Sequence, residues 1–148
     1  LKPTRIESVA AFYQKRHWPG TNEDHTQAIL RFASGETADI VISTLAAAPR
    51  EKYRVLGTRG AIAYDWDAAD LRIYRPREGG SPTVDRIPLK PAQNHFFYES
   101  VAAHILEGKP LAVTPEQARR NVAVLEAAEE SAESGQPVTP RHEENYET

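Results

Sequence analysis

The sequence predicts an α+β domain in which the strands come first and the helices last. Up to about residue 90, short segments of alternating apolar and polar residues are separated by turn residues, which is typical of strands. After that point the apolar residues recur with helical spacing between clear start and stop signals. Hairpin-length connections favour antiparallel pairing. We therefore expect a predominantly antiparallel, open-faced sheet of about six or seven strands with two C-terminal helices on one face.

The strands are read from alternation and from the turns that bound them. The clearest alternation places Ala28 and Leu30 on one face of a strand and Ile29 on the other. The segment Gly57-Thr58-Arg59-Gly60 predicts a hairpin turn, and residues 76–82 predict a longer one. Strands are expected at residues 6–13, 26–33, 38–45, 53–56, 61–64, 71–75 and 84–89.

The first helix is expected at residues 94–107. Asn94 can cap it, and Gly108 and Pro110 follow its end. Its apolar face carries residues four positions apart, namely Phe97, Val101 and Ile105.

The second helix has stronger signals. Thr114 is expected at the N-cap, with Pro115 at the first helical position and Gln117 completing a capping box. Gly135 is expected to end it. The expected apolar stripe consists of Ala118, Val122, Leu125, Ala128 and Ala132.

Two helices cover only part of one sheet face, so the other face is expected to be solvated or to pack against a partner. Its mixture of aromatic, aliphatic and polar residues favours an interface, which predicts a homo-oligomer through the open sheet. We place the domain at residues 1–140 and expect residues 141–148 to form a charged, frayed tail.

Composition excludes several classes of protein. The net charge of −3 gives no electrostatic footprint for nucleic acid, and no apolar run approaches the roughly 20 residues that span a bilayer. The chain has no cysteine, which excludes disulfides and thiolate chemistry and agrees with a cytoplasmic location. It also has no methionine and begins with Leu1, so we interpret it as a fragment of a longer protein.

No motif in the sequence predicts a catalytic residue, a cofactor-binding residue or a metal site. His95 and Glu99 share a helix face but lack a third ligand. Residues 65–70 are rich in aspartate, yet they lack the glycine and glutamate that a calcium loop needs, so we expect a solvated turn. Ser100 and His104 lie one helical turn apart without an orienting third group.

Two parts of the chain, in order, resemble the C-terminal domain of the Gfo/Idh/MocA oxidoreductases (glucose–fructose oxidoreductase and inositol dehydrogenase type). The first contains residues 25–35, H-T-Q-A-I-L-R-F-A-S-G, followed by residues 53–62, Y-R-V-L-G-T-R-G-A-I. The second contains residues 96–108, then residues 110–116, P-L-A-V-T-P-E, and residues 124–132, V-L-E-A-A-E-E-S-A, with Gly135 and Val138.

The resemblance implies that the parent protein uses NAD or NADP. It also implies a substrate that is a sugar, a polyol or a related hydroxy compound. The family's cofactor fingerprint G-x-G-x-x-G, the E-K-P segment that carries its catalytic lysine and its acid/base Asp-x-x-x-His segment are not found in this sequence, and we interpret Lys2-Pro3 as a chance echo of the Lys-Pro pair. The resemblance therefore implies a missing N-terminal Rossmann domain, and we expect this chain alone to be inactive and to hold no cofactor.

The resemblance also implies where substrate contacts lie. Loops at one edge of the sheet and the start of the first C-terminal helix approach the substrate in this family. The matching residues here are His17, Trp18, Arg50, His95, Phe96 and Tyr98. Phe96 cannot hydrogen-bond a hydroxyl group, which puts a polyol in doubt, whereas Arg50 could hold an anionic group.

Two other functions fit parts of the sequence. A stand-alone binding or oligomerisation module would need only the sheet domain. A small RNA-binding domain would use Gly57-Thr58-Arg59-Gly60 as a GXXG clamp, although that clamp lies between helices and this segment lies between expected strands.

Overall fold

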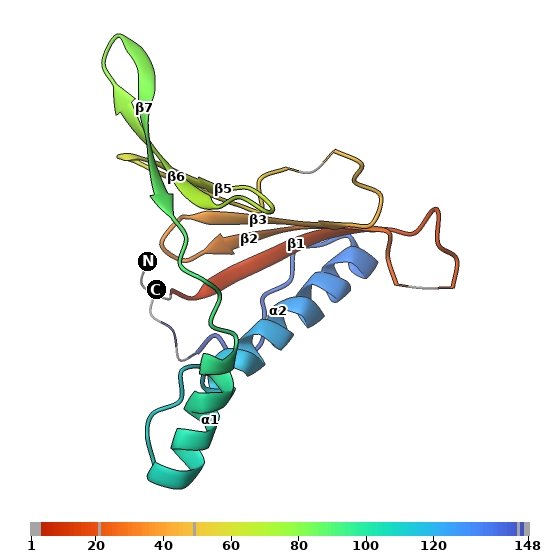
Figure 1. The fold of residues 1–148 in the computed structure, drawn as a ribbon. Helices are drawn as coiled ribbons and strands as arrows, with labels where there is room; N and C mark the ends of the chain where they lie inside the picture. The colour runs from red at the N-terminus through yellow and green to blue at the C-terminus, as the bar shows by residue number, and fades with distance from the viewer. Residues whose placement is uncertain (1–3, 21, 49, 145, 147–148) are drawn as a thin grey trace. The chain divides into compact units, whose positions relative to one another are not determined.

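The computed structural model describes residues 4–20, 22–48, 50–144 and 146, and its chain divides into two units (Figure 1). Unit 1 contains the residues up to Leu45 and those from His95 onward, and unit 2 is Ala46–Asn94. Seven strands and two later helices lie within the described residues, which confirms the α+β class. The strands form two antiparallel sheets, of three and four strands, because no ladder joins the third described strand to the fourth.

Unit 1 contains a sheet with the strand order β1-β2-β3, where β1 is Ile6–Gln14, β2 is His25–Phe32 and β3 is Thr37–Ser43. The pairing places residues in rows across the three strands. One face has the row Val9, Leu30 and Ala38, and the opposite face has the row Phe12, Gln27 and Val41. The predicted alternation in β2 is confirmed, because Ala28 and Leu30 are buried whereas Ile29 and Arg31 are exposed.

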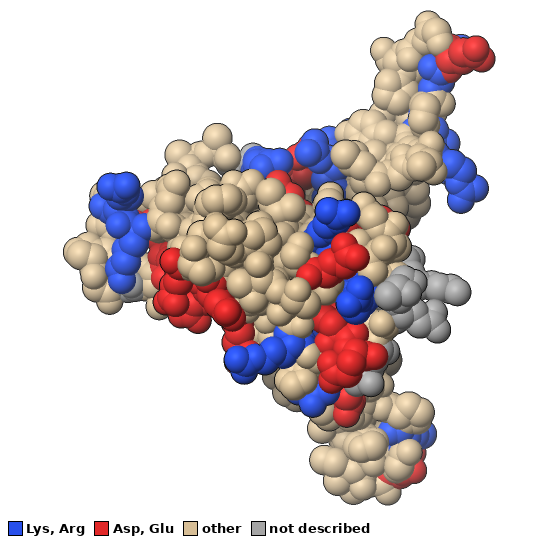
Figure 2. Space-filling view, turned by 180° about the vertical axis from the view of Figure 1, so that it is seen from behind, with Lys and Arg blue, Asp and Glu red and all other residues tan. Residues whose placement is uncertain are grey.

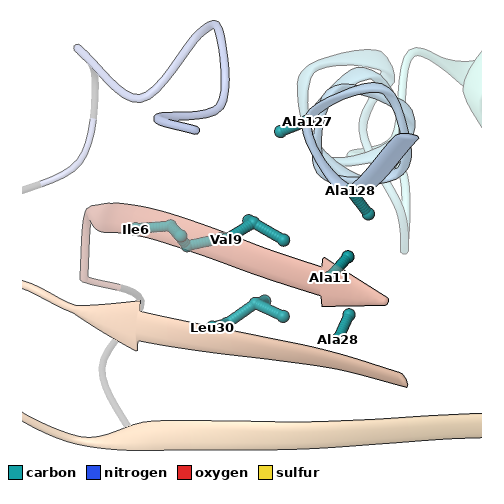
Figure 3. Close-up of a cluster of buried hydrophobic side chains, with 7 residues drawn as sticks. All are labelled: Ile6, Val9, Ala11, Ala28, Leu30, Ala127 and Ala128. Atoms are coloured by element: carbon teal, nitrogen blue, oxygen red, sulfur yellow. The ribbon is translucent and has the colours of Figure 1, made fainter. Parts of the chain in front are cut away.

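The core of unit 1 lies between this sheet and α2 (Pro115–Ser134). Figure 3 shows Ala128 of α2 pointing toward Ala11 of β1, with Ala127 on the adjoining side of the helix. The buried cluster consists of Ile6, Val9, Ala11, Ala28, Leu30, Ala127 and Ala128. Alanines let the helix approach the sheet closely, so the interior is filled by short side chains at high density.

The phase of the expected stripe on α2 is partly wrong. Val122 and Leu125 are 54% and 62% exposed, whereas Ala123, Ala127, Ala128 and Ser131 are buried. The helical period places the larger aliphatic residues toward the core, whereas the face that packs against β1 carries small ones. The predicted ends of the helix are confirmed. Thr114 and Gln117 form the capping box, and Gly135 ends the helix in the left-handed conformation, with φ of 69°.

The edge of β1 that faces away from β2 is satisfied by the C-terminal part of the chain. Val9 exchanges two backbone hydrogen bonds with Val138, of 2.8 and 2.9 Å. The backbone N–H of Ala11 donates to Ser131 Oγ at 3.0 Å, and that of Ile6 donates to Glu143 Oε2 at 2.5 Å. Ser131 lies on the buried face of α2 because its hydroxyl accepts the Ala11 N–H, which would otherwise need an acceptor on a neighbouring strand.

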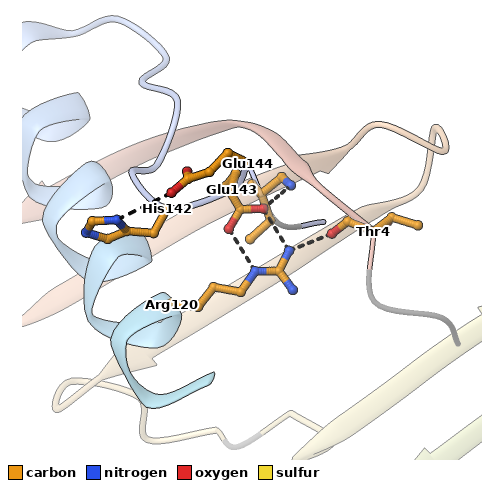
Figure 4. Close-up of polar contacts among 6 residues, drawn as sticks. Thr4, Arg120, His142, Glu143 and Glu144 are labelled. Carbon is orange, nitrogen blue, oxygen red and sulfur yellow. Dashed lines mark hydrogen bonds and ion pairs between the residues drawn. The ribbon is translucent and has the colours of Figure 1, made fainter. Parts of the chain in front are cut away.

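The expectation of a frayed tail is wrong for Glu143, which is only 4% exposed. Figure 4 shows the Arg120 guanidinium directed at Glu143 and at Thr4. Its nitrogens lie 2.7 and 2.8 Å from the Glu143 oxygens and 2.5 Å from the Thr4 carbonyl oxygen. Tyr146 adds its ring, whose centroid lies 3.6 Å from the guanidinium carbon. Of the expected tail, residues 145, 147 and 148 lie outside the described residues, as do residues 1–3 at the start.

The first helix, α1, is His95–Glu107, close to its predicted bounds, and none of its residues is buried. On its expected apolar face, Phe97 is 47% and Ile105 is 74% exposed. The following loop folds back on the helix, because the Ala112 N–H donates to Ser100 Oγ at 2.8 Å. Among the described residues, it is α2 that packs on the sheet. Neither of the two described helices is long and apolar enough to cross a membrane.

Unit 2 is a four-stranded meander in the order β4-β5-β6-β7. Its strands are β4 (Tyr53–Gly57), β5 (Gly60–Tyr64), β6 (Asp70–Arg77) and β7 (Gly80–Pro88). The hairpin expected at residues 57–60 is confirmed. A Cβ on Gly60, whose φ is 149°, would come within 2.3 Å of the Tyr74 carbonyl oxygen, so this position requires glycine.

The turn expected at residues 76–82 contains fewer residues than predicted, because β6 and β7 remain paired as far as Arg77 and Gly80. Pro76 and Pro82 favour a longer turn in the sequence. Pro82 is accommodated on β7, the edge strand, and Pro76 lies beyond the part of β6 that pairs with β5.

Candidate functional site

The six predicted contact residues lie in three segments. His17 and Trp18 lie in the loop between β1 and β2, Arg50 precedes β4 in unit 2, and His95, Phe96 and Tyr98 are in the first turn of α1. Figure 1 shows the β1–β2 loop and α1 at opposite ends of α2. Within unit 1, the structure therefore does not bring the loop residues and the helix residues together.

His17 and Trp18 form a ring pair on the β1–β2 loop. Their ring centroids are 4.6 Å apart and the planes are nearly perpendicular, at 85°, which is the edge-to-face arrangement that aromatic rings favour. His17 is exposed and Trp18 is 50% exposed. An indole ring and an imidazole ring are thus in contact with each other in a loop at the surface.

The carboxylate of Asp24 lies beneath this loop and is 1% exposed. Its Oδ2 accepts hydrogen bonds from the backbone N–H groups of Arg16 and His17, both at 2.5 Å, and its Oδ1 accepts one from Trp18 at 3.2 Å. The bond from the His17 N–H is the main cause that lowers the pKa of Asp24, while burial opposes it. The resulting stabilisation is present above the ordinary aspartate pKa and is lost as the pH falls through the lowered value.

Asp24 is not among the residues that the sequence identifies as candidates. Its only sequence signal is an aspartate at the end of a loop directly before a strand, which is common in solvated turns as well. Whether such a side chain turns inward depends on where the loop places its N–H groups, and the spacing of residues alone does not determine this.

The start of α1 presents its side chains to solvent. Phe96 is 58% and Tyr98 is 73% exposed. Tyr98 contacts Phe97 edge-to-face at 5.5 Å, and His95 Nε2 lies 4.0 Å from Glu99 Oε1. Phenol, imidazole and carboxylate groups on one helical turn can hydrogen-bond a hydroxyl-bearing ligand.

Arg50 borders a shallow depression of unit 2 together with Glu51, Asp65 and Trp66. Asp65 is already held by Arg72 Nη2 at 2.7 Å. The aspartate-rich segment at residues 65–70 forms the turn that was expected, in which Asp67 has a φ of 60°.

A second feature of unit 2, which sequence reasoning missed, is a cation among aromatic rings. Lys52 Nζ lies 4.8 Å from the Trp66 ring centroid and 5.7 and 5.9 Å from those of Tyr53 and Tyr64. The two tyrosines are partners across β4 and β5. The lysine charge is thus stabilised on the strand pair by ring faces.

The charges of the described residues are mixed. Figure 2 shows Lys and Arg side chains interspersed with Asp and Glu over the face in view. No group of three or more His, Cys, Asp or Glu residues suited to a metal ion occurs within the part of the chain that the structure describes.

Comparison with known proteins gives a family and a fold. Residues 2–139 match the family model GFO_IDH_MocA_C, described as the C-terminal alpha/beta domain of an oxidoreductase family. No curated protein matches the chain in sequence.

Several solved structures share the fold. The Bacillus subtilis protein yvaA, assigned as an oxidoreductase, has a TM-score of 0.80 and 17% identity, over 91% of this chain and 45% of its own. An NAD-binding protein from Listeria innocua has a TM-score of 0.73 and 22% identity, over 97% and 44%. A protein from Desulfitobacterium hafniense, assigned as an NADPH-dependent oxidoreductase, has a TM-score of 0.76 and 21% identity, over 90% and 42%. The chain therefore spans less than half the length of these structures.

Proposed function

Because this chain belongs to the Gfo/Idh/MocA oxidoreductase family as its C-terminal alpha/beta domain, we propose that it is the substrate-side and oligomerisation domain of an NAD(P)-dependent oxidoreductase. The substrate that we propose is a sugar, a polyol or a related hydroxy compound. The observation that carries the proposal is the family match over residues 2–139. The shared fold supports it, because all seven strands and both helices begin within the matched range.

We propose that the dinucleotide is bound outside these 148 residues. The sequence has no G-x-G-x-x-G segment following a strand, which is what a Rossmann domain uses to hold a pyrophosphate. The structurally similar proteins named as NAD-binding or NADPH-dependent are more than twice as long as the part that this chain matches. In this proposal, one half of the parent protein binds the cofactor, and the half described here contributes substrate contacts and the oligomer interface.

For the oligomer, we propose that a second copy packs on the sheet face of unit 1 opposite α2. Three large apolar side chains lie exposed there, namely Phe12 at 62%, Ile29 at 41% and Val41 at 40%. Polar pairs lie among them, such as Gln27 with Asp39 at 3.3 Å. A mixed apolar and polar surface of this kind suits a self-complementary interface.

The location of the cofactor site is tested by calorimetric titration of the chain with NADH and NADPH. We expect no heat of binding at cofactor concentrations up to about 1 mM. That result would mean a dissociation constant above about 1 mM, which corresponds to a binding free energy weaker than about −4 kcal/mol. The Listeria innocua NAD-binding protein, titrated with NADH in parallel, is the positive control. Micromolar binding by this chain would place a cofactor site inside these residues and contradict the proposal.

The sequence immediately upstream in the gene separates this proposal from a stand-alone module. A reading frame that continues upstream into G-x-G-x-x-G and a later Lys-Pro pair supports the two-part oxidoreductase. A stop codon directly before the first residues, with a stable dimer in solution, would instead support the stand-alone module.

A further inference from the structure

Asp24 joins the ends of three strands as well as the loop above it. Its backbone N–H donates to the Gln14 carbonyl oxygen at 2.8 Å, at the end of β1. Its own carbonyl oxygen accepts from the Thr44 N–H at 2.9 Å and from Thr44 Oγ1 at 3.1 Å, just after β3. Asp24 itself directly precedes β2. The residue is thereby fixed in position before its side chain makes any bond to the loop.

The side chain then fixes the backbone of residues 16–18. Three consecutive N–H groups donate to one buried carboxylate, and hydrogen bonds to an ionised acceptor are stronger than those between neutral groups. The His17 and Trp18 side chains leave the loop from these same residues, and their rings meet edge-to-face. The backbone positions from which the two side chains leave the loop are therefore held from below, and the contact between the rings is made in the absence of a ligand.

We propose that Asp24 is a positioning residue that holds His17 and Trp18 as a preformed surface for the ring of a sugar or cyclic polyol. The inference rests on the proposed function, which places substrate recognition in this domain. The face of the Trp18 indole can stack against the C–H groups of such a ring, and an imidazole nitrogen of His17 can hydrogen-bond a hydroxyl. A surface that is already ordered avoids the loss of side-chain entropy on binding.

The geometry requires a carboxylate rather than an amide. Oδ2 serves the N–H groups of Arg16 and His17 and Oδ1 serves that of Trp18, so all three donors need an acceptor. An asparagine oxygen could replace Oδ2, but its NH₂ group would then face the Trp18 N–H, donor against donor. Asp24→Asn should therefore retain the first two bonds and lose the third, whereas Asp24→Ala loses all of them.

The first test measures loop order in the folded chain. In Asp24→Ala, we expect amide exchange at residues 16–18 to accelerate and the nuclear Overhauser contacts between the His17 and Trp18 rings to disappear, with exchange in α2 unchanged. Asp24→Asn should show a smaller effect. Glu23→Ala, which removes the exposed carboxylate next to it, is the matched control and should show none. Persistence of the ring contacts in Asp24→Ala would overturn the proposal.

The second test measures recognition, by titrating the chain with myo-inositol, glucose and galactose while following its two indole N–H resonances. We expect the Trp18 signal to shift with at least one compound and the Trp66 signal to stay fixed. Affinity should fall about tenfold in Asp24→Ala, the effect of having to order two side chains on binding.

The outcomes separate this inference from the proposed function. Shifts confined to the start of α1 or to unit 2 would overturn the role of Asp24 and leave a substrate domain in place. A Trp18 signal that is silent toward all three compounds would also overturn the inference, whereas the proposed function is tested by the cofactor titration and by the upstream sequence. An equal affinity in wild type and Asp24→Ala would show that the loop does not need its anchor.

Discussion

Asp24 and Glu143 are both buried carboxylates that accept main-chain N–H groups at the ends of strands. Each satisfies donors that strand pairing leaves over, since the loop N–H groups and the Ile6 N–H have no partner strand on that side. Burying a carboxylate is costly unless it is paired or hydrogen-bonded, and here every oxygen has at least one donor. Asp24 therefore fixes the loop between β1 and β2, and Glu143 fixes the C-terminal segment against the start of β1.

For Glu143, replacement by alanine should destabilise unit 1 by about 3 kcal/mol, the usual cost of leaving one member of a buried ion pair alone. Arg120, whose side chain is 15% exposed, would lose its partner, and the Ile6 N–H would lose its acceptor. The measurement is the free energy of unfolding in urea. Its reporter is Trp18 fluorescence in a Trp66→Phe background, because Trp18 lies in unit 1 and Trp66 in unit 2.

The matched control is Glu144→Ala, which removes the neighbouring, 67% exposed carboxylate that lies 3.9 Å from His142. An exposed pair contributes little, so a change below about 1 kcal/mol is expected. Equal effects of the two substitutions would contradict the role assigned to the buried pair.

At the scale of elements, α2 shows which features follow from local sequence and which do not. Its start and end follow from Thr114, Gln117 and Gly135, because capping depends on residues within one turn of the helix. Its buried face does not, because Val122 and Leu125 fit a helical period as well as the small residues that face the sheet. Which of them face inward depends on how α2 packs against β1 and β2, and these strands lie far away in the sequence.

The strands were predicted within a few residues for the same reason, since alternation and turn residues are local. The site was less accessible to sequence reasoning. His17 and Trp18 were named, but the sequence gives no sign that Asp24 lies beneath them. Nor does it indicate that Lys52 lies among three rings, because this depends on the register of β4 and β5.

Thr114→Ala should lower the free energy of unfolding of unit 1 by about 1 kcal/mol, the usual cost of removing an N-cap. The substitution leaves the Gln117 N–H, now 3.3 Å from Thr114 Oγ1, without its acceptor. Urea unfolding with the same Trp18 reporter measures the effect. Thr114→Ser keeps the hydroxyl and should lie near wild type, and a loss as large as that of alanine would argue against capping as the cause.

At the scale of the whole molecule, the proposed packing of a second copy predicts the mass at which the chain sediments. Wild-type chain at tens of micromolar should sediment as a dimer, and Ile29→Asp should sediment as a monomer, because a charge would be buried at the centre of the interface. Ile29 is 41% exposed in the chain, so its loss should leave the fold intact, which circular dichroism checks.

Leu125→Asp is the matched control, since it places the same charge on the exposed side of α2, where Leu125 is 62% exposed. It should remain dimeric. A wild-type monomer at these concentrations, or a dimer that persists in Ile29→Asp, would contradict the proposed interface.

The covering of the outer edge of β1 has a consequence for self-association. An unpaired edge strand is a template on which further chains can add and eventually grow into fibrils. On β1 that template is blocked by Val138, Ser131 and Glu143, each of which occupies a main-chain group that an incoming strand would need. Cleaving the chain after α2 would remove Val138 and Glu143 and so free the main-chain groups of Val9 and Ile6, which the intact protein keeps paired, for a strand of another chain.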